Sequence, residues 1–527
     1  MKNLPLGMST LSTLRNNDCI YVDKTEFALQ LIQLPGAYFL SRPRRFGKSL
    51  FVDTLKEIFE GHQGLFEGLY IHDHWDWSRR FPVIKIDFAG GVIASRHELD
   101  EKIREILVRN GERLQVATGE VSLSGMFTDL ISGAVRQYGR KAVVLVDEYD
   151  KPMLDAIDKP EVAAEIREGL KNLYSVLKEQ DANLQFVFMT GVSKFSRVSL
   201  FSGINQLTDI TLDARYSALC GYTGQDLRRC FGEHLAGVDW DELKLWYNGY
   251  SWGGEVRVYN PFDILQFIAK GLDYRNYWFE TGSPSFLIKL FRKACYFLPS
   301  LEGIETSEEI LDSFDVERIN PVTLLFQTGY LTIQAIHTRM RRKIYTLSPP
   351  NYEVRAALND QFINAYTDLV NEKLGLQQQI YSALQQGNLP VLSGVIKRLF
   401  AAIPWRNFTH SDLPHFEGYY ASVLYAFFAS LDATIIPEDI SCFGQADLTV
   451  IMGDQVYVME FKLVDDTAIE NNPALEQIIA RQYAEKYRRQ TGQRVHELGL
   501  VFSRTQRGLI KADWRTDTIN PCPGLNG

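Results

Sequence analysis

The sequence predicts an α/β protein built on a parallel β-sheet, and two apolar segments carry this prediction. The first ends near residue 41, continues into a loop with Gly47-Lys48-Ser49, and is followed by LFVDTLKEIFEG, whose apolar residues have helical spacing. The second, residues 141–152, reads KAVVLVDEYDKP and ends abruptly in two carboxylates. A strand that is apolar on both faces is typical of the centre of a parallel sheet. Further strands alternate with helices over about the first 210 residues, which completes the α/β pattern.

The loop after the first strand has the chemistry of a phosphate site. In a strand–loop–helix unit, the backbone N–H groups of the loop and of the helix N-terminus face an anion. We expect the loop at Gly47 to bind a nucleotide, Lys48 to reach the β- and γ-phosphates, and the Ser49 hydroxyl to bind Mg²⁺. The motif G-x-x-x-x-G-K-[ST] lacks its first glycine, because Arg42 stands there, and Arg45 is expected to contact the nucleotide. A basic turn before a surface helix is the alternative interpretation.

The carboxylates after the second strand favour the nucleotide site over that alternative. Ligands bind at the carboxyl ends of parallel strands, where Asp147 would hold Mg²⁺ through water and Glu148 would polarise the attacking water. Residues 184–189 predict a neighbouring strand, after which Thr190 or Ser193 can sense the γ-phosphate. An acidic turn after one strand is common, but two such motifs in the right order predict a P-loop ATPase sheet.

Composition sets broad limits on the class of protein. A length of 527 residues allows two to four domains, and 45% hydrophobic with 23% charged residues is ordinary for a globular protein. The net charge of −9 argues against a generally basic nucleic-acid binder, although a local basic face can coexist with it. Six cysteines without metal or disulfide spacing, no signal peptide and no bilayer-length apolar run predict a cytoplasmic protein with no membrane partner.

We expect four parts along the chain. Residues 1–215 would form the ATPase domain, 216–349 a helical lid, 350–405 a helical connector, and 406–527 a second catalytic domain. In the lid, residues 324–333 and 342–349 predict a strand pair, as in a winged helix. The basic connection from Arg339 to Lys343 is either a DNA contact or, as we favour, a solvated turn. The aromatic residues at 246–252 can stack bases, but at this density they favour core packing.

A second constellation of charged residues lies at 443–466, FGQADLTVIMGDQVYVMEFKLVDD. Gly453-Asp454 between two β-branched segments predicts a hairpin. Glu460 and Lys462 are two residues apart on its second strand and leave the same face, while Asp447 can be brought opposite that face. Two carboxylates can hold one or two Mg²⁺ ions, and the lysine can orient or activate the water that attacks a phosphodiester. A surface hairpin with alternating charges is the alternative.

Flanking segments add further candidates for this second site. Glu417 lies on an apolar helix, where an acidic residue needs a partner or a function, and can complete the metal shell. The helix LEQIIARQYAEKY places Gln477, Tyr483 and Lys486 where they can cover the site and contact the substrate backbone.

Together these motifs resemble the family of bacterial proteins that join an AAA-ATPase-like N-terminal domain to a C-terminal PD-(D/E)XK nuclease-superfamily domain. The matching stretches cover nearly the whole chain and are YVDKT, RPRRFGKSL, VVLVDEYDKP, FMTGVSKFS, LWYNGYSW, YNPFDIL, LLFQTGYLTI, GQADLTV and VMEFKL. RPRRFGKS is the form that this family uses, so the missing glycine is part of the resemblance. The resemblance implies a restriction-endonuclease-like α/β domain at the C-terminus. It also implies that Lys48, Ser49, Asp147 and Glu148 match the family's nucleotide site, and that Asp447, Glu460 and Lys462 match its nuclease site.

The leading hypothesis is an ATP-dependent or ATP-regulated nuclease. It would use Mg²⁺, with Mn²⁺ as an alternative, and act as a homo-oligomer, and its favoured substrate is DNA, with RNA left open. Defence against phage or other mobile DNA is the setting that this architecture favours. A non-cleaving ATPase switch or nucleic-acid-binding module is the second hypothesis, and a nucleotide kinase, which leaves the second acidic cluster unexplained, is the third.

Overall fold

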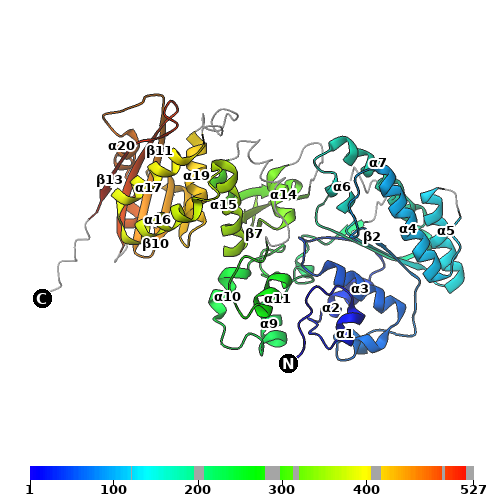
Figure 1. Ribbon diagram of the computed structural model, residues 1–527. Coiled ribbons are helices and arrows are strands. Elements are labelled where there is room, and N and C mark those ends of the chain that lie inside the picture. The colour runs from blue at the N-terminus through cyan, green and yellow to red at the C-terminus, as the bar shows by residue number, and fades with distance from the viewer. Residues whose placement is uncertain are drawn as a thin grey trace. The chain divides into compact units, whose positions relative to one another are not determined.

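The computed structural model describes residues 1–119, 122–194, 207–278, 297–312, 320–404, 417–488 and 493–517. The chain forms two compact units (Figure 1). Unit 1 comprises Met1–Thr281 with Glu305–Glu353, and unit 2 comprises Gly282–Ile304 with Val354–Gly527. Within the described ranges, no helix has the length and apolar character needed to cross a lipid bilayer.

The core of unit 1 is a five-stranded parallel sheet in the order β2-β3-β4-β1-β5. Its strands are β1 (Gly36–Ser41), β2 (Val83–Asp87), β3 (Ala142–Asp147), β4 (Leu184–Gly191) and β5 (Leu207–Asp209). Only β4 separates β1 from β3, so the loop after β1 and the carboxylates after β3 open at the same edge of the sheet. The predicted P-loop ATPase sheet is therefore confirmed.

Helices cover this sheet and extend the unit. They are α1 (Leu11–Asn16), α2 (Thr25–Ile32), α3 (Lys48–Glu60), α4 (Arg96–Leu114), α5 (Leu123–Tyr138), α6 (Lys151–Asp155), α7 (Pro160–Glu179), α9 (Gly224–Phe231), α10 (Trp240–Tyr247), α11 (Pro261–Ala269), α13 (Glu308–Asp312) and α14 (Pro321–Thr328). Helix α3 follows the phosphate loop and packs on the sheet through Phe51 against Phe188 and Phe59 against Phe186. Helices α4, α5 and α7 lie side by side (Figure 1).

A small three-stranded sheet completes unit 1. Strands β6 (Ile304–Ser307), β7 (Thr332–Arg339) and β8 (Arg342–Ser348) lie in the order β6-β8-β7, and helices α13 and α14 connect β6 to β7. Strand, helices and hairpin in this order give the winged-helix-like arrangement that the sequence predicts.

One strand boundary in the predicted lid is wrong. Residues 324–328 belong to helix α14, and the strand begins only at Thr332. The Asn320 side chain caps this helix by accepting from the N–H groups of Val322 and Thr323, and Gly329 ends it at φ 90°. These end signals determine the structure of the apolar run LLFQT, which by composition alone resembles a strand.

The aromatic residues of the lid pack in its core, as expected. Tyr247, Tyr250 and Trp252 are buried, and Trp246 contacts Tyr247 and Tyr274. These rings therefore do not form a base-stacking surface.

Unit 2 contains a five-stranded sheet in the order β13-β12-β11-β10-β9. Its strands are β9 (Thr434–Ser441), β10 (Gly444–Met452), β11 (Gln455–Val464), β12 (Arg494–Ser503) and β13 (Gly508–Thr516). Strands β11 and β12 are parallel, and the other neighbouring pairs are antiparallel. The helices are α15 (Tyr352–Thr367), α16 (Lys373–Gln386), α17 (Leu389–Ala402), α19 (Glu417–Ala429), α20 (Pro473–Ala480) and α21 (Glu485–Arg488).

The two faces of this sheet carry different helices. Tyr457 and Phe461 of β11 lie on the face covered by α16, α17 and α19, where Tyr457 donates to a carbonyl of α16. Val456 and Val458 lie on the other face, in a cluster with Ile478 of α20. Alternation along β11 therefore places Glu460 on the α20 face. The mixed α/β sheet agrees with the predicted restriction-endonuclease-like fold.

The buried His496 predicts a pH dependence of unit 2 stability. Its ring lies between Gln455 and Thr516, and burial lowers its pKa from 6.5 to about 4. Neutral His496 therefore stabilises the fold above pH 6.5, and this contribution is lost as the pH falls from 6.5 towards 4. Between pH 7 and pH 5 we expect unit 2 to lose about 2 kcal/mol of unfolding free energy.

Hydrogen exchange of the β11 and β12 amides, corrected for intrinsic rates, measures this loss. The same measurement on His496→Gln, which cannot take up a proton, should show a smaller loss. An equal loss in both proteins would contradict the role of His496.

Candidate nucleotide and nuclease sites

The phosphate loop joins β1 to α3. Gly47 has φ 90° and is the N-cap residue of α3, whose first two residues are Lys48 and Ser49. The first N–H groups of a helix have no partner within it, so this terminus offers donors to an anion. A side chain at Gly47 would need a left-handed backbone conformation, which explains the glycine at this position. The loop thus has the form that the sequence predicts.

Lys48 is held against the loop itself. Its Nζ donates to the backbone oxygens of Arg42, at 2.9 Å, and Pro43, at 3.0 Å. Burial lowers the pKa of Lys48, while the charge of Asp147 opposes this shift. The ammonium group is therefore fixed beside the loop and can exchange carbonyl oxygens for phosphate oxygens.

Asp147 at the end of β3 has a buried carboxylate, 1% exposed. Its Oδ1 accepts from the Thr190 hydroxyl at 2.6 Å and from the Glu148 N–H at 3.1 Å. Its Oδ2 is buried and has no hydrogen-bond partner among the described residues. A buried carboxylate oxygen without a donor is costly, so this atom fits a cation or a cation-bound water.

Glu148 lies beside Asp147 and lines the same pocket as Lys48. Its φ is 50°, a left-handed conformation that is uncommon for residues other than glycine. Burial raises the pKa of its carboxyl, and the charge of Lys48 opposes this shift. An unusual backbone conformation and a raised pKa are features of functional carboxylates.

The two candidate sensor residues after β4 have different partners. Thr190 donates to Asp147, whereas the Ser193 hydroxyl donates to Asp150 at 2.5 Å. Asp150 also accepts the N–H groups of Val192 and Ser193, so it fixes the start of the loop after β4. Sequence reasoning did not single out Asp150, although its place three residues after Asp147 is a signal that could have drawn attention to it.

Arg42 does not point toward the phosphate site. Its guanidinium is buried, donates to the backbone oxygens of Ser41, Thr211 and Tyr216, and lies 4.0 Å from the centre of the Trp252 ring. Arg45 lines the pocket with its guanidinium 3.9 Å from the centre of the Phe262 ring. Of these two arginines, only Arg45 therefore lines the pocket, and its contact with a nucleotide stays a prediction.

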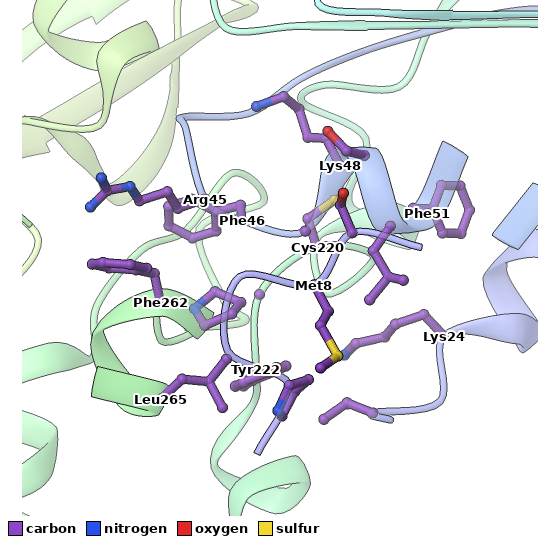
Figure 2. Close-up of a pocket in the computed structure, with 18 of the residues that line it drawn as sticks. Met8, Lys24, Arg45, Phe46, Lys48, Phe51, Cys220, Tyr222, Phe262 and Leu265 are labelled. Atoms are coloured by element: carbon purple, nitrogen blue, oxygen red, sulfur yellow. The ribbon is translucent and has the colours of Figure 1, made fainter. Parts of the chain in front are cut away.

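A pocket of about 400 Å³ extends from the phosphate loop (Figure 2). Its phosphate end contains Lys48 and Ser49, and the remaining wall comes from the start of the chain, from residues 219–222 and from α11. This wall is mainly apolar and includes Pro5, Met8, Ile20, Tyr222, Phe262 and Leu265. The volume lies in the range of small-molecule sites. Sequence reasoning missed this wall, because no local motif shows that these segments meet.

In unit 2, the predicted hairpin brings Asp447, Glu460 and Lys462 together. Glu460 accepts the Asp447 N–H at 3.3 Å and the Lys462 Nζ at 3.0 Å, and Asp447 accepts the N–H of Phe461 at 2.7 Å. All three side chains lie on or beside the α20 face of strands β10 and β11. This is the cluster that the D-x12-E-x-K spacing predicts.

The electrostatics of this cluster favour a metal ion. Glu460 is 2% exposed, and burial together with the charge of Asp447 raises its pKa to about 7, although Lys462 acts in the opposite direction. Two neighbouring carboxylates of which one is buried form a hard oxygen-ligand set that suits Mg²⁺ or Mn²⁺. Asp447 and Glu460 are therefore the residues that would hold the ion.

The other candidates around this site are placed differently. Gln477 donates to Glu460 and, at 3.2 Å, to the Tyr483 hydroxyl, so α20 does cover the site. Lys486 pairs with the buried Asp439, which also accepts from Tyr487, so its ammonium holds β9 in place. Glu417 is the first residue of α19, and its side chain lies outside the described part of the structure. Nucleic-acid contacts of Gln477, Tyr483 and Lys486 stay predictions.

Comparisons with known proteins match the two domains in which these residues lie. The family described as "Predicted AAA-ATPase" matches residues 5–201, and the PD-(D/E)XK nuclease superfamily matches residues 415–512. The chain is 46% identical over 510 residues to "Uncharacterized protein in vnfD 5'region" of Azotobacter chroococcum mcd 1, and the match covers 97% of this chain and 98% of that protein. The chain belongs to the family that joins an AAA-ATPase-like domain to a PD-(D/E)XK nuclease domain.

In this AAA-ATPase and PD-(D/E)XK family member, the position of Arg42 suggests a structural role. Where a phosphate loop usually begins with glycine, this chain has a buried guanidinium that donates to three backbone oxygens. Arg42→Gly, which restores the general motif, should therefore lower the unfolding free energy of unit 1 by about 3 kcal/mol or more. Thermal unfolding followed by tryptophan fluorescence measures this effect.

Arg44→Gly is the matched control, because Arg44 is an exposed arginine of the same loop. We expect it to change the unfolding free energy by no more than about 1 kcal/mol. If Arg42→Gly were as stable as Arg44→Gly, the structural role of Arg42 would be wrong.

Proposed function

We propose that this protein binds and hydrolyses ATP in unit 1 and hydrolyses phosphodiester bonds of nucleic acid, with DNA as the favoured substrate, in unit 2. The observation that carries the proposal is the cluster of Asp447, Glu460 and Lys462 on one sheet face, with a buried Glu460 whose pKa is raised. The AAA-ATPase-like and nuclease-superfamily domains support the two general activities. The residue roles, the metal and the substrate are part of the proposal.

In the nucleotide site, each residue has a role that follows from its position. Lys48 would neutralise the β- and γ-phosphates, and the N-terminus of α3 would bind them through its N–H groups. Ser49 and Asp147 would hold Mg²⁺, because Asp147 Oδ2 lies buried without a donor among the described residues. Thr190 fixes Asp147 through its hydroxyl, and Glu148 would accept a proton from the attacking water.

In the nuclease site, Asp447 and Glu460 would hold Mg²⁺ or Mn²⁺. The ion would supply Lewis-acid stabilisation of the negative charge that develops on the phosphate. Lys462 is 30% exposed and donates to Glu460, so its ammonium lies at the rim where water and a phosphodiester can approach. Gln477 orients Glu460 through its amide, which limits the rotation of that carboxylate.

The biological setting belongs to the same proposal. An ATPase joined to a DNA-cleaving domain suits cytoplasmic defence against phage or other mobile DNA. A homo-oligomer is favoured because nucleotide sites of this class often receive a residue from a neighbouring subunit. These statements rest on the family's domain architecture.

Cleavage of plasmid, linear duplex DNA, single-stranded DNA and RNA in Mg²⁺ or Mn²⁺, with and without ATP, tests the nuclease. Lys462→Ala removes the ammonium beside Glu460 and should lower cleavage by about 10²-fold or more. Lys397→Ala, which removes an exposed lysine of α17, should cleave at the wild-type rate.

Lys48→Ala in the same assay shows whether nucleotide regulates cleavage. Loss of the ATP effect with cleavage retained would support coupling between the two activities. Cleavage that survives in Lys462→Ala, or that is absent from every substrate in the wild type, would argue against the proposed nuclease and favour a non-cleaving ATPase.

ATP turnover by Glu148→Gln tests the role of the second carboxylate. Glutamine keeps the shape of the side chain but accepts no proton, so we expect phosphate release to fall about 10²-fold while ATP binding persists. Glu161→Gln, an exposed glutamate of α7, is the control. Unchanged turnover in Glu148→Gln would refute the assignment, and binding is measured by anisotropy of a fluorescent ATP analogue.

A further inference from the structure

The tip of the β7–β8 hairpin holds the densest run of basic residues in the sequence outside the phosphate loop. Arg339, Arg341, Arg342 and Lys343 supply four cations within five residues. The distal half of the hairpin, from His337 to Lys343, is exposed throughout. The whole chain has a net charge of −9, so this cluster of four cations is opposite in sign to the chain as a whole.

The backbone of the tip is locally unfavourable. Arg339 pairs with Arg342 across a two-residue turn, in which Met340 has φ 50° and Arg341 has φ 62°. Such turns favour Asn-Gly, and each non-glycine residue in this region costs on the order of 1 kcal/mol. Met340 is also 90% exposed. Met340 and Arg341 therefore make the turn less stable than Asn-Gly would.

The charges of the tip repel one another. Arg339 and Arg342 lie directly opposite each other, and opposed like charges destabilise a strand pair. Among the described residues, Arg339 pairs with Glu305 at 3.3 Å. Hydrogen bonds from Arg215, and to a smaller degree the charge of Lys343, hold the pKa of Asp213 below its usual range. Among the described residues, Arg341, Arg342 and Lys343 form no ion pair, so the tip keeps a positive charge.

The base of the hairpin is firmly anchored. The Ser251 N–H donates to the Thr332 hydroxyl at 2.7 Å, and Arg257 donates to the backbone oxygen of Gln334 at 2.9 Å. Helix α14 of the same winged-helix-like part is largely buried, so it offers little surface to a partner. The hairpin tip is therefore more accessible to a partner than α14, although residues 308–310 of α13 are exposed as well.

The anchor also connects the hairpin to the phosphate loop. Trp252, the residue after Ser251, stacks on Arg42 and contacts Phe46 with ring centres 5.3 Å apart. Arg42 and Phe46 are both residues of the loop that precedes Lys48. Contacts through Ser251 and Trp252 thus connect β7 to the phosphate loop.

We propose that the tip of the β7–β8 hairpin, Arg339–Lys343, is a nucleic-acid contact that binds the phosphate backbone independently of base sequence. This inference rests on the proposed function, because it names a second place where the substrate of unit 2 is held. Clustered cations on a protruding ribbon match the closely spaced phosphates of a duplex. Exposed Met340 adds an apolar contact at the same surface.

The experiment measures the affinity of the full-length chain for a random-sequence duplex by fluorescence anisotropy, from 50 to 200 mM salt. Lys462→Ala is the background in every protein, so that the duplex is not cleaved. The charge variant carries Arg341→Gln and Arg342→Gln. The matched control carries Arg136→Gln and Lys141→Gln, two exposed cations elsewhere in unit 1.

Each phosphate contact contributes about 0.9 to the slope of log affinity against log salt concentration. The charge variant should therefore lower this slope by about 1.8, so that the loss of affinity over this salt range shrinks by about tenfold. The control should keep the slope of the background protein.

A turn variant separates binding from folding. Met340→Asn with Arg341→Gly installs the residues that the turn favours, so its melting temperature should stay equal or rise. Its affinity for the duplex should nevertheless fall, and its salt slope should decrease by about 0.9 because one cation is lost. A misfolded hairpin would lower the melting temperature and is thereby distinguished.

Each outcome decides between the proposals. Binding with unchanged slopes in both tip variants would overturn the tip contact and leave the proposed function standing. No binding of the duplex at 50 mM salt would overturn the tip contact and exclude duplex DNA as the substrate, while the cleavage assay on single-stranded DNA and RNA would still decide the proposed nuclease. Loss of binding to phosphatidylserine vesicles, with duplex binding unchanged, would overturn the nucleic-acid assignment in favour of a membrane surface.

Discussion

The burial of one guanidinium, that of Arg42, is the interaction on which the nucleotide-binding part of unit 1 depends. A buried charge is costly unless it is hydrogen-bonded, and Arg42 donates through Nη1 and Nη2 to backbone oxygens at the end of β1, after β5 and at Tyr216, while its Nε has no partner among the described residues. Burial lowers its pKa only to about 10, so the group stays charged at neutral pH. Stacking on Trp252 extends this connection into the lid. Arg42 thereby fixes the backbone at the start of the phosphate loop by hydrogen bonds, at the position where the general phosphate-loop motif has a conformationally free glycine.

Both candidate sites depend on a second physical constraint, which is a carboxylate buried with incomplete compensation. Asp147 has one oxygen bonded to Thr190 and Glu148, and its other oxygen is buried without a partner among the described residues. Glu460 is buried next to Asp447, and Lys462, Gln477 and the Asp447 N–H offset its charge only in part, since its pKa stays raised. An unsatisfied buried acceptor costs about 1–3 kcal/mol. A divalent cation bound at each site would explain why the carboxylates of Asp147 and Glu460 are buried, because the ion would supply the missing positive charge.

The parts of these sites that can be predicted from the sequence are those set by interactions between residues close together in the chain. The strands β1 and β3 are predictable because apolar β-branched runs end in distinctive polar residues, and Glu460 and Lys462 are predictable because strand periodicity is two. The partners that fix these residues are not predictable, since Asp150 meets Ser193 and Lys486 meets Asp439 only through tertiary contacts. The apolar wall of the nucleotide pocket is missed for the same reason. Residues 324–328 show the opposite error, because their composition suggests a strand while the caps at Asn320 and Gly329 determine a helix.

The two site lysines share a feature that bears on how ligands would bind. Lys48 donates to the loop oxygens of Arg42 and Pro43, and Lys462 donates to Glu460, so both side chains are already ordered by oxygen atoms. Ordering a free lysine costs up to about 2 kcal/mol of side-chain entropy, and this cost is met during folding when the lysine is already bound. A phosphate would then replace one set of oxygen partners by another with more negative charge. Such an exchange favours ligands with anionic oxygens over neutral ones, because only anionic oxygens interact more strongly with the ammonium group than the protein oxygens that they displace.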